Sequence, residues 1–119
     1  MIVAIRLLVA ALLLGFFAAP ALAQTCREPK TGTRSVPIFS PPLAQVVTGS
    51  GRLQFYSAPD PRCAMNGVFV IPKDELVAYA ETSDGWASVM YVNPRSGADV
   101  SGWVRSERLK ITGTMGPKQ

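Results

Sequence analysis

The chain of 119 residues contains no histidine, and this absence excludes several kinds of active site. A Ser-His-Asp triad and a Cys-His peptidase site both use an imidazole as the general base. A zinc site would lack its usual nitrogen ligand, and two cysteines are too few to make one. The adjacent carboxylates Asp74 and Glu75 would point to opposite faces of a strand and are typical of a solvated turn. We therefore predict that the protein is not an enzyme and has no catalytic residue, metal site or cofactor.

The excess of one sign of charge over the other is also small. Twelve Lys and Arg residues against eight Asp and Glu residues give a formal net charge of +4. The cations are scattered along the chain, for example at Arg27, Lys30 and Arg34 early and at Arg105, Arg108 and Lys110 late. A nucleic-acid site would need a larger and more concentrated excess of positive charge. We therefore predict no nucleic-acid partner, whereas a slight positive charge suits solubility near a negatively charged envelope.

Long apolar runs are absent except at the N-terminus. Ile2 to Ala19 is apolar apart from Arg6, and Ala21-Leu22-Ala23 is a small-x-small cleavage motif. This order is typical of a secretory signal peptide. The apolar run is nearly long enough to span a membrane, so an uncleaved anchor is the alternative. We predict a signal peptide over residues 1–23, a periplasmic or secreted mature protein, and no stable membrane insertion after cleavage.

Both cysteines of the chain, Cys26 and Cys63, follow the predicted cleavage site. In an oxidising compartment an even pair of cysteines indicates a disulfide. The bridge would close a loop of nearly forty residues, which stabilises a small domain by roughly 3–4 kcal/mol in the chain-entropy model. A redox-active pair is the alternative, but the two cysteines form no Cys-x-x-Cys motif. We predict a structural disulfide between them.

Residues 24–48 are rich in Pro, Thr and Ser, and their prolines exclude a helix. We expect an extended, Pro-rich arm here, whose last part, Leu43–Thr48, forms a short strand. The run Pro37–Pro42 could serve as a polyproline ligand. The other interpretation is a strap that lays Ile38 and Phe39 on the domain, and an anchoring disulfide favours the strap.

Short apolar segments then alternate with turn signals, which is the pattern of a small all-β barrel or sandwich. Gly49-Ser50-Gly51 between Leu43–Thr48 and Arg52–Ser57 predicts one hairpin, and Asp84-Gly85 predicts another. We expect a single 3₁₀ turn at Ser106–Leu109. The expected strands after the arm are Arg52–Ser57, Val68–Ile71, Glu75–Thr82, Trp86–Val92, Val100–Arg105 and Lys110–Thr112. A barrel is favoured because it leaves few exposed edges.

Four motifs in order resemble the bacterial SH3-like (SH3b) domain family over about Gly51 to Ile111. They are Ser57-Ala58-Pro59 after an apolar strand, the strand and turn from Val68 to Asp74, Gly85-Trp86-Ala-Ser-Val89, and Gly102-Trp103-Val104 followed by Leu109. The chain departs from the family pattern at Cys63, at Lys73-Asp74 where a Gly is usual, and in the long connection Asn93–Asp99. The resemblance implies a small SH3-like barrel of about five to seven short antiparallel strands over residues 49–112, followed by a flexible tail over residues 113–119.

The resemblance also implies a non-catalytic binding module, because some members of the family bind peptidoglycan or peptides. The expected partner is a cell-wall peptide or glycan, or an envelope protein. The alternative is an inhibitor or immunity protein that binds a cell-wall hydrolase or a toxin in the periplasm.

Aromatic side chains are the best candidates for a binding groove, because they bury a large area with little loss of entropy. The four candidates are Tyr56, Trp86, Tyr91 and Trp103. Tyr56 lies on the strand face opposite Leu53 and Phe55, so we expect it in the groove. We expect Trp86 to be half exposed, and Tyr91 and Trp103 to belong to the core.

Overall fold

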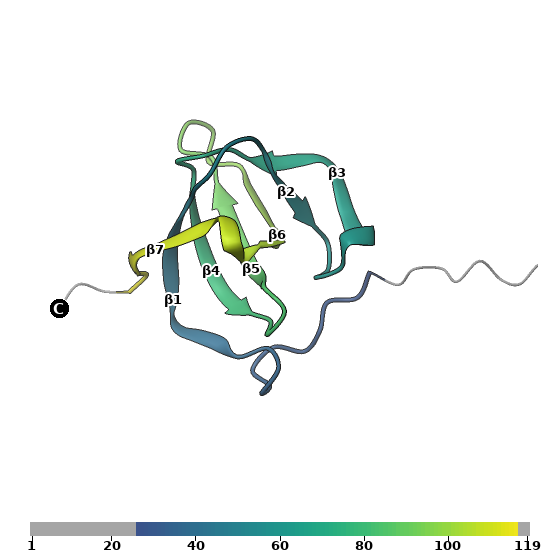
Figure 1. Cartoon of the computed structure of the whole chain (residues 1–119). Helices are drawn as coiled ribbons and strands as arrows, with labels where there is room; N and C mark the ends of the chain where they lie inside the picture. The colour runs from purple at the N-terminus through teal and green to yellow at the C-terminus, as the bar shows by residue number, and fades with distance from the viewer. Residues whose placement is uncertain (1–25, 117–119) are drawn as a thin grey trace, which may run out of the picture.

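The computed structural model describes residues 26–116, so the predicted signal peptide and residues 117–119 lie outside the described residues. Seven antiparallel strands form one sheet in the order β3-β2-β6-β5-β4-β1-β7 (Figure 1). The strands are β1 (Ile38–Val47), β2 (Leu53–Tyr56), β3 (Ala64–Val70), β4 (Glu75–Glu81), β5 (Trp86–Val92), β6 (Asp99–Arg105) and β7 (Leu109–Thr114). Two 3₁₀ turns, η3 (Pro61–Cys63) and η4 (Ser106–Arg108), precede β3 and β7. The all-β class is thus confirmed.

The sheet curls around one core to which all seven strands contribute. Phe55 of β2, Val89 of β5 and Val104 of β6 are almost completely buried there, and Leu109 of β7 packs against the same cluster. The sheet is not closed, because β3 and β7 are its two edges. The molecule is therefore barrel-like, with one open seam between the first and last strands of the sheet.

Side-chain alternation in β2 and β5 follows the sequence expectation. Leu53 and Phe55 are buried in the core while Tyr56 lies on the other side of β2. In β5, Ala87 and Val89 belong to the core and Trp86 belongs to a separate cluster. These assignments hold because successive side chains of a strand point to opposite faces.

The hairpin expected around Gly49-Ser50-Gly51 is wrong. β1 lies between β4 and β7 and pairs with both, whereas β2 pairs with β3 and β6. The backbone N–H of Val47 donates to the carbonyl of Asp74, and that of Thr48 donates to the carbonyl of Arg108. The end of β1 is thus held by distant segments. A glycine-containing turn does not by itself determine whether the two strands that flank it pair with each other.

β1 begins at Ile38, well inside the segment expected to be an arm. Ile38 pairs with Ala80 and Leu43 pairs with Ala78, and the register shifts between them. Pro41 and Pro42 lie in this shifted part. Proline has no N–H to donate to a ladder, and it is tolerated here because the regular pairing is interrupted. The arm proper is therefore residues 26–37, and it is called the arm from here on.

The apolar segment Val68–Ile71, which was expected to form a strand, is not buried on both faces. It forms the end of edge strand β3, in which Val70 is buried while Phe69 is 37% exposed, and Ile71 lies beyond the strand, 50% exposed. The Arg52 guanidinium lies 4.1 Å from the centroid of the Phe69 ring and covers part of it. One face of a strand in an antiparallel sheet can lie in solvent, so only the side chains on the other face are buried.

The connections after β4 agree with the predictions. β4 and β5 form the hairpin expected at Asp84-Gly85, and Gly85 adopts a φ of 89° that glycine takes without strain. η4 occupies the expected 3₁₀ position. β7 extends to Thr114, two residues into the segment expected to be a tail.

Lys73 in the turn between β3 and β4 has a φ of 78°, a left-handed conformation that is unfavourable for a residue with a Cβ. Lys73→Gly removes this strain but adds backbone freedom to the unfolded chain. We expect the free energy of unfolding to rise by about 0.5–1 kcal/mol, measured by urea denaturation. Lys110→Gly, in the extended strand β7, is the control and should lower it; a loss of stability in Lys73→Gly would contradict the prediction.

Candidate binding surfaces

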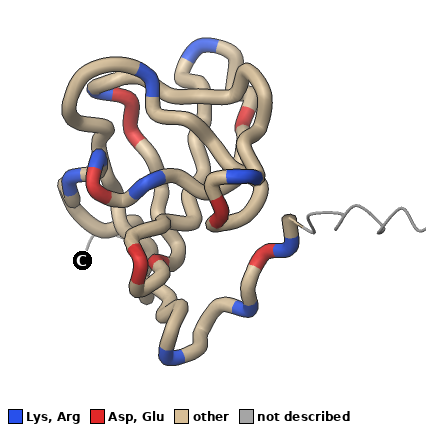
Figure 2. The backbone as a smooth tube through the Cα atoms, turned by 45° about the vertical axis from the view of Figure 1, so that its right-hand side comes forward, with Lys and Arg blue, Asp and Glu red and all other residues tan. Residues whose placement is uncertain are grey.

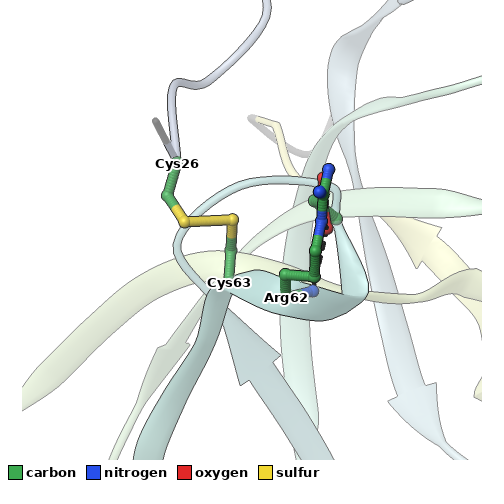
Figure 3. A network of polar contacts seen from close by, with 4 residues as sticks. Cys26, Arg62 and Cys63 are labelled. Atoms are coloured by element: carbon green, nitrogen blue, oxygen red, sulfur yellow. Dashed lines mark hydrogen bonds and ion pairs between the residues drawn. A yellow bond between two sulfur atoms is a disulfide. The ribbon is translucent and has the colours of Figure 1, made fainter. Parts of the chain in front are cut away.

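A disulfide joins Cys26 to Cys63, as predicted, and fastens the start of the arm to η3 (Figure 3). The two Cα atoms are 5.7 Å apart, and the cysteines are separated by 37 positions in the sequence. Cys63 is 3% exposed, whereas Cys26 lies at the surface. Disulfides form and persist in oxidising compartments, so the bridge indicates an extracytoplasmic environment.

The η3 turn that carries Cys63 is shaped by Asp60 and Arg62. Asp60 Oδ1 accepts a hydrogen bond from the backbone N–H of Arg62 at 2.8 Å and caps the turn. The Arg62 guanidinium donates to both carboxylate oxygens, at 3.1 Å from Nε and 2.9 Å from Nη2. Bidentate pairs of this kind fix geometry as well as charge. The anchor point of the disulfide is therefore held in place by local contacts.

The hydrogen bonds from the side chain and then the backbone of Arg62 lower the pKa of Asp60 from 3.8 to about 2. Because the folded-state pKa is depressed, the stabilisation is present above pH 3.8 and is lost as the pH falls through about 2. In Arg62→Ala we expect the pKa of Asp60 to rise towards 3.8, measured by NMR titration of the carboxyl carbon. An unchanged pKa would contradict this cause. Arg95→Ala, in another loop, is the control.

Three of the four predicted aromatic candidates come together on the outer side of the sheet. Tyr56, Trp86 and Trp103, from β2, β5 and β6, form one cluster with Val36 and Ala80, and they are called the tryptophan surface below. The Tyr56 and Trp86 rings meet edge to face with centroids 4.8 Å apart. The Arg105 guanidinium lies 4.0 Å from the centroid of the Trp86 ring, a cation–π contact.

The arm covers the tryptophan surface. It runs from the η3 side of the sheet past the β4–β5 turn to the start of β1 (Figure 1). Glu28 Oε1 accepts a hydrogen bond from Trp103 Nε1 at 2.9 Å, and Val36 is buried in the cluster. As a result Trp86 and Trp103 are each only 1% exposed. The expectation that Trp86 is half exposed is therefore wrong, because Val36 of the arm, Arg105 and Tyr56 together cover it.

Tyr91 lies apart from this surface. It is half-buried and packs against the main core, as expected for a residue on the Val89 face of β5. It also lines a shallow hollow of about 210 Å³ with Lys73, Asp74, Glu75, Val92 and Pro94. The structure thus does not bring Tyr91 together with the other three candidates.

An apolar hollow of about 340 Å³, which was not predicted from the sequence, opens on the outer face of the sheet. It lies over β1, β4, β5 and β7, with Val77, Met90, Val92 and Met115 as its main apolar lining; it is called the apolar hollow below. Tyr79 stands at its border, where its hydroxyl lies 3.9 Å from Met90 Sδ. The sequence does contain an indication of this hollow, because Leu76-Val77-Ala78-Tyr79 is a strand segment with apolar residues on both faces.

In the described part of the chain, charged residues do not gather into one patch. Figure 2 shows Lys and Arg distributed over the loops of the domain and along the arm. Within residues 26–116 there is no cluster of three or more His, Cys, Asp or Glu side chains able to hold a metal ion. Over the same residues, no helix has the length and hydropathy needed to cross a membrane.

The apolar hollow is thus open to a partner, while the tryptophan surface is occupied by the chain's own arm. Comparison of the chain with protein-family models, with curated proteins and with solved structures finds no match in any of the three.

Proposed function

We propose that the chain is a non-catalytic binding module, periplasmic or secreted, whose partner is an envelope protein. The observation that carries the proposal is the apolar hollow on the outer face of the sheet. Val92 of its lining is 45% exposed, and Tyr79 at its border adds a further apolar side chain that is 38% exposed. Contiguous exposed apolar surface that is rimmed by polar groups is typical of a protein-binding site.

The lining of the apolar hollow favours a protein over a glycan. Met90 and Met115 are flexible, polarisable side chains that adapt to an apolar partner. The two tryptophans, whose rings could stack on a sugar, lie beneath the arm. Cell-wall peptide or glycan is therefore the second candidate. The first candidate, binding to an envelope protein, includes an inhibitor or immunity role, in which the bound protein is a hydrolase or a toxin.

Site-specific photo-cross-linking tests the proposal. A benzophenone amino acid replaces Tyr79 beside the hollow in one variant and Phe69 on edge strand β3 in another. The two positions match, because Tyr79 is 38% and Phe69 37% exposed. We expect a discrete cross-linked protein from Tyr79 in cells that export the chain, and none from Phe69. Met90→Lys, which puts a charge into the hollow, should abolish the product.

Binding to purified peptidoglycan separates the two candidates. Sedimentation of the oxidised protein with sacculi, together with no cross-linked protein at Tyr79, would overturn the proposal in favour of a cell-wall ligand. A cross-linked protein that persists in Met90→Lys would place the interface elsewhere. Where the partner is a hydrolase, the purified pair should show reduced enzyme activity that Met90→Lys restores.

A further inference from the structure

The arm is held on the tryptophan surface by few contacts besides the disulfide. Ten of its twelve residues are exposed, and only Val36 is buried. The backbone N–H groups of Glu81 and Ser83 donate to the carbonyls of Pro37 and Ser35 at 3.3 Å, which is long for such bonds. The Glu28–Trp103 bond is a further polar contact between the arm and this surface. The arm contributes nothing to the main core, whose buried residues all come from the strands.

The surface beneath the arm has a definite chemistry. Trp103 Nε1 offers one hydrogen-bond donor, which the Glu28 carboxylate takes. Trp86 and Trp103, with Ala80 beside them, form an apolar seat that one aliphatic side chain, Val36, fills. The arm reaches both points in non-helical, non-strand conformation, with a turn closed by the bond from Gly32 N–H to the Val36 carbonyl. A segment that fits this surface therefore combines a carboxylate with a β-branched aliphatic residue.

We propose that the arm is a cover latched by the disulfide, and that reduction by a dithiol opens it and exposes the tryptophan surface as a binding site for such a carboxylate-bearing peptide. The proposal goes beyond the function proposed above, since the apolar hollow and the tryptophan surface share no residue.

The opening step is a thiol–disulfide exchange. A thiolate of the dithiol attacks Sγ of Cys26, the exposed cysteine, and the electron pair of the broken bond leaves on Cys63 Sγ, which takes up a proton. The second thiol of the dithiol then attacks the dithiol sulfur that is bonded to Cys26 Sγ in the mixed disulfide. Cys26 leaves as a free thiol. The dithiol is oxidised to its own disulfide, and its two protons pass to the two cysteines.

The covalent latch matters because it keeps the arm close to its seat. With the disulfide closed, the arm is tethered at Cys26 and at the start of β1, so the effective concentration of Val36 and Glu28 at the surface is high. After reduction the tether at Cys26 is lost and the arm can swing about its junction with β1. The strands of the sheet are connected independently of the arm, so they can persist when it leaves.

Tryptophan quenching by acrylamide, combined with amide hydrogen exchange, tests the opening. We expect the quenching constant to rise at least threefold on reduction while β4, β5 and β6 stay folded. Their amides should exchange faster only to the extent that the lower global stability requires, and still far more slowly than in the unfolded chain. The oxidised Glu28→Gln protein should stay close to the oxidised wild type, because the latch is intact. Unchanged quenching with a folded sheet would overturn the proposal. Exchange of the sheet amides at the rate of the unfolded chain on reduction would also overturn it, because the disulfide would then serve stability alone.

A peptide in trans tests the site itself. The probe is a synthetic peptide of residues 27–37, and the protein is Cys26→Ser/Cys63→Ser/Val36→Asp, in which the resident arm is unlatched and disfavoured. We expect this variant to bind the peptide at least tenfold more tightly than the oxidised wild type does. A Glu28→Gln peptide should bind about five- to tenfold more weakly, because the carboxylate bond to the indole is lost. Equal binding of the two peptides, or none by a variant whose sheet amides are protected, would overturn the assignment.

Discussion

Replacing both cysteines by serine should lower the free energy of unfolding by about 3–4 kcal/mol. The bridge joins residues 37 positions apart, and its absence lets the unfolded chain explore conformations that the closed loop forbids. The folded state loses less, because Cys63 is in a turn that Asp60 and Arg62 shape independently. The effect is therefore expected chiefly through the unfolded chain.

Urea denaturation of the oxidised wild type, the reduced wild type and Cys26→Ser/Cys63→Ser measures this effect. The last two should unfold at closely similar urea concentrations, well below the oxidised protein. The slope of the free energy against urea should increase, because the unfolded chain without the bridge exposes more surface. A difference of less than about 1 kcal/mol would show that the bridge does not constrain the unfolded chain as the chain-entropy model requires.

Gly102→Ala should destabilise the protein by about 1–3 kcal/mol. A Cβ at this position would lie 2.8 Å from the carbonyl oxygen of Tyr56 and 3.1 Å from Cδ2 of Phe55. The carbonyl belongs to the backbone of β2, the neighbouring strand of β6, and it cannot turn aside as a flexible side chain would. The two strands must separate, which disturbs the packing of Phe55 in the main core.

Gly113→Ala is the matched control, since no atom lies within 4 Å of a Cβ built there. Its position near the end of edge strand β7 is exposed, so the change should stay within about 0.5 kcal/mol. Thermal unfolding of the two variants beside the wild type gives the comparison. Equal unfolding temperatures for Gly102→Ala and Gly113→Ala would contradict the close approach of β2 and β6.

The sequence by itself determined the features that depend on neighbouring residues or on simple chemistry. Alternation placed Leu53 and Phe55 inside, and Asp84-Gly85 placed the β4–β5 turn, because a strand has a period of two and a tight turn needs specific residues. The pairing of Cys26 with Cys63 followed from there being two cysteines in the chain. The all-β class followed from the spacing of such segments.

Only the tertiary structure decided which distant segments meet. β1 pairs with β4 and β7, and no residue within the Gly49-Ser50-Gly51 turn encodes that choice. Trp86 was expected to be half exposed from its strand position, yet it is buried in a cluster that includes Val36 of the arm. The apolar hollow joins side chains from four strands that are separate in the sequence. Burial and pairing between distant segments depend on how the whole chain covers its apolar surface, and a local pattern carries no information about which remote segment will provide that cover.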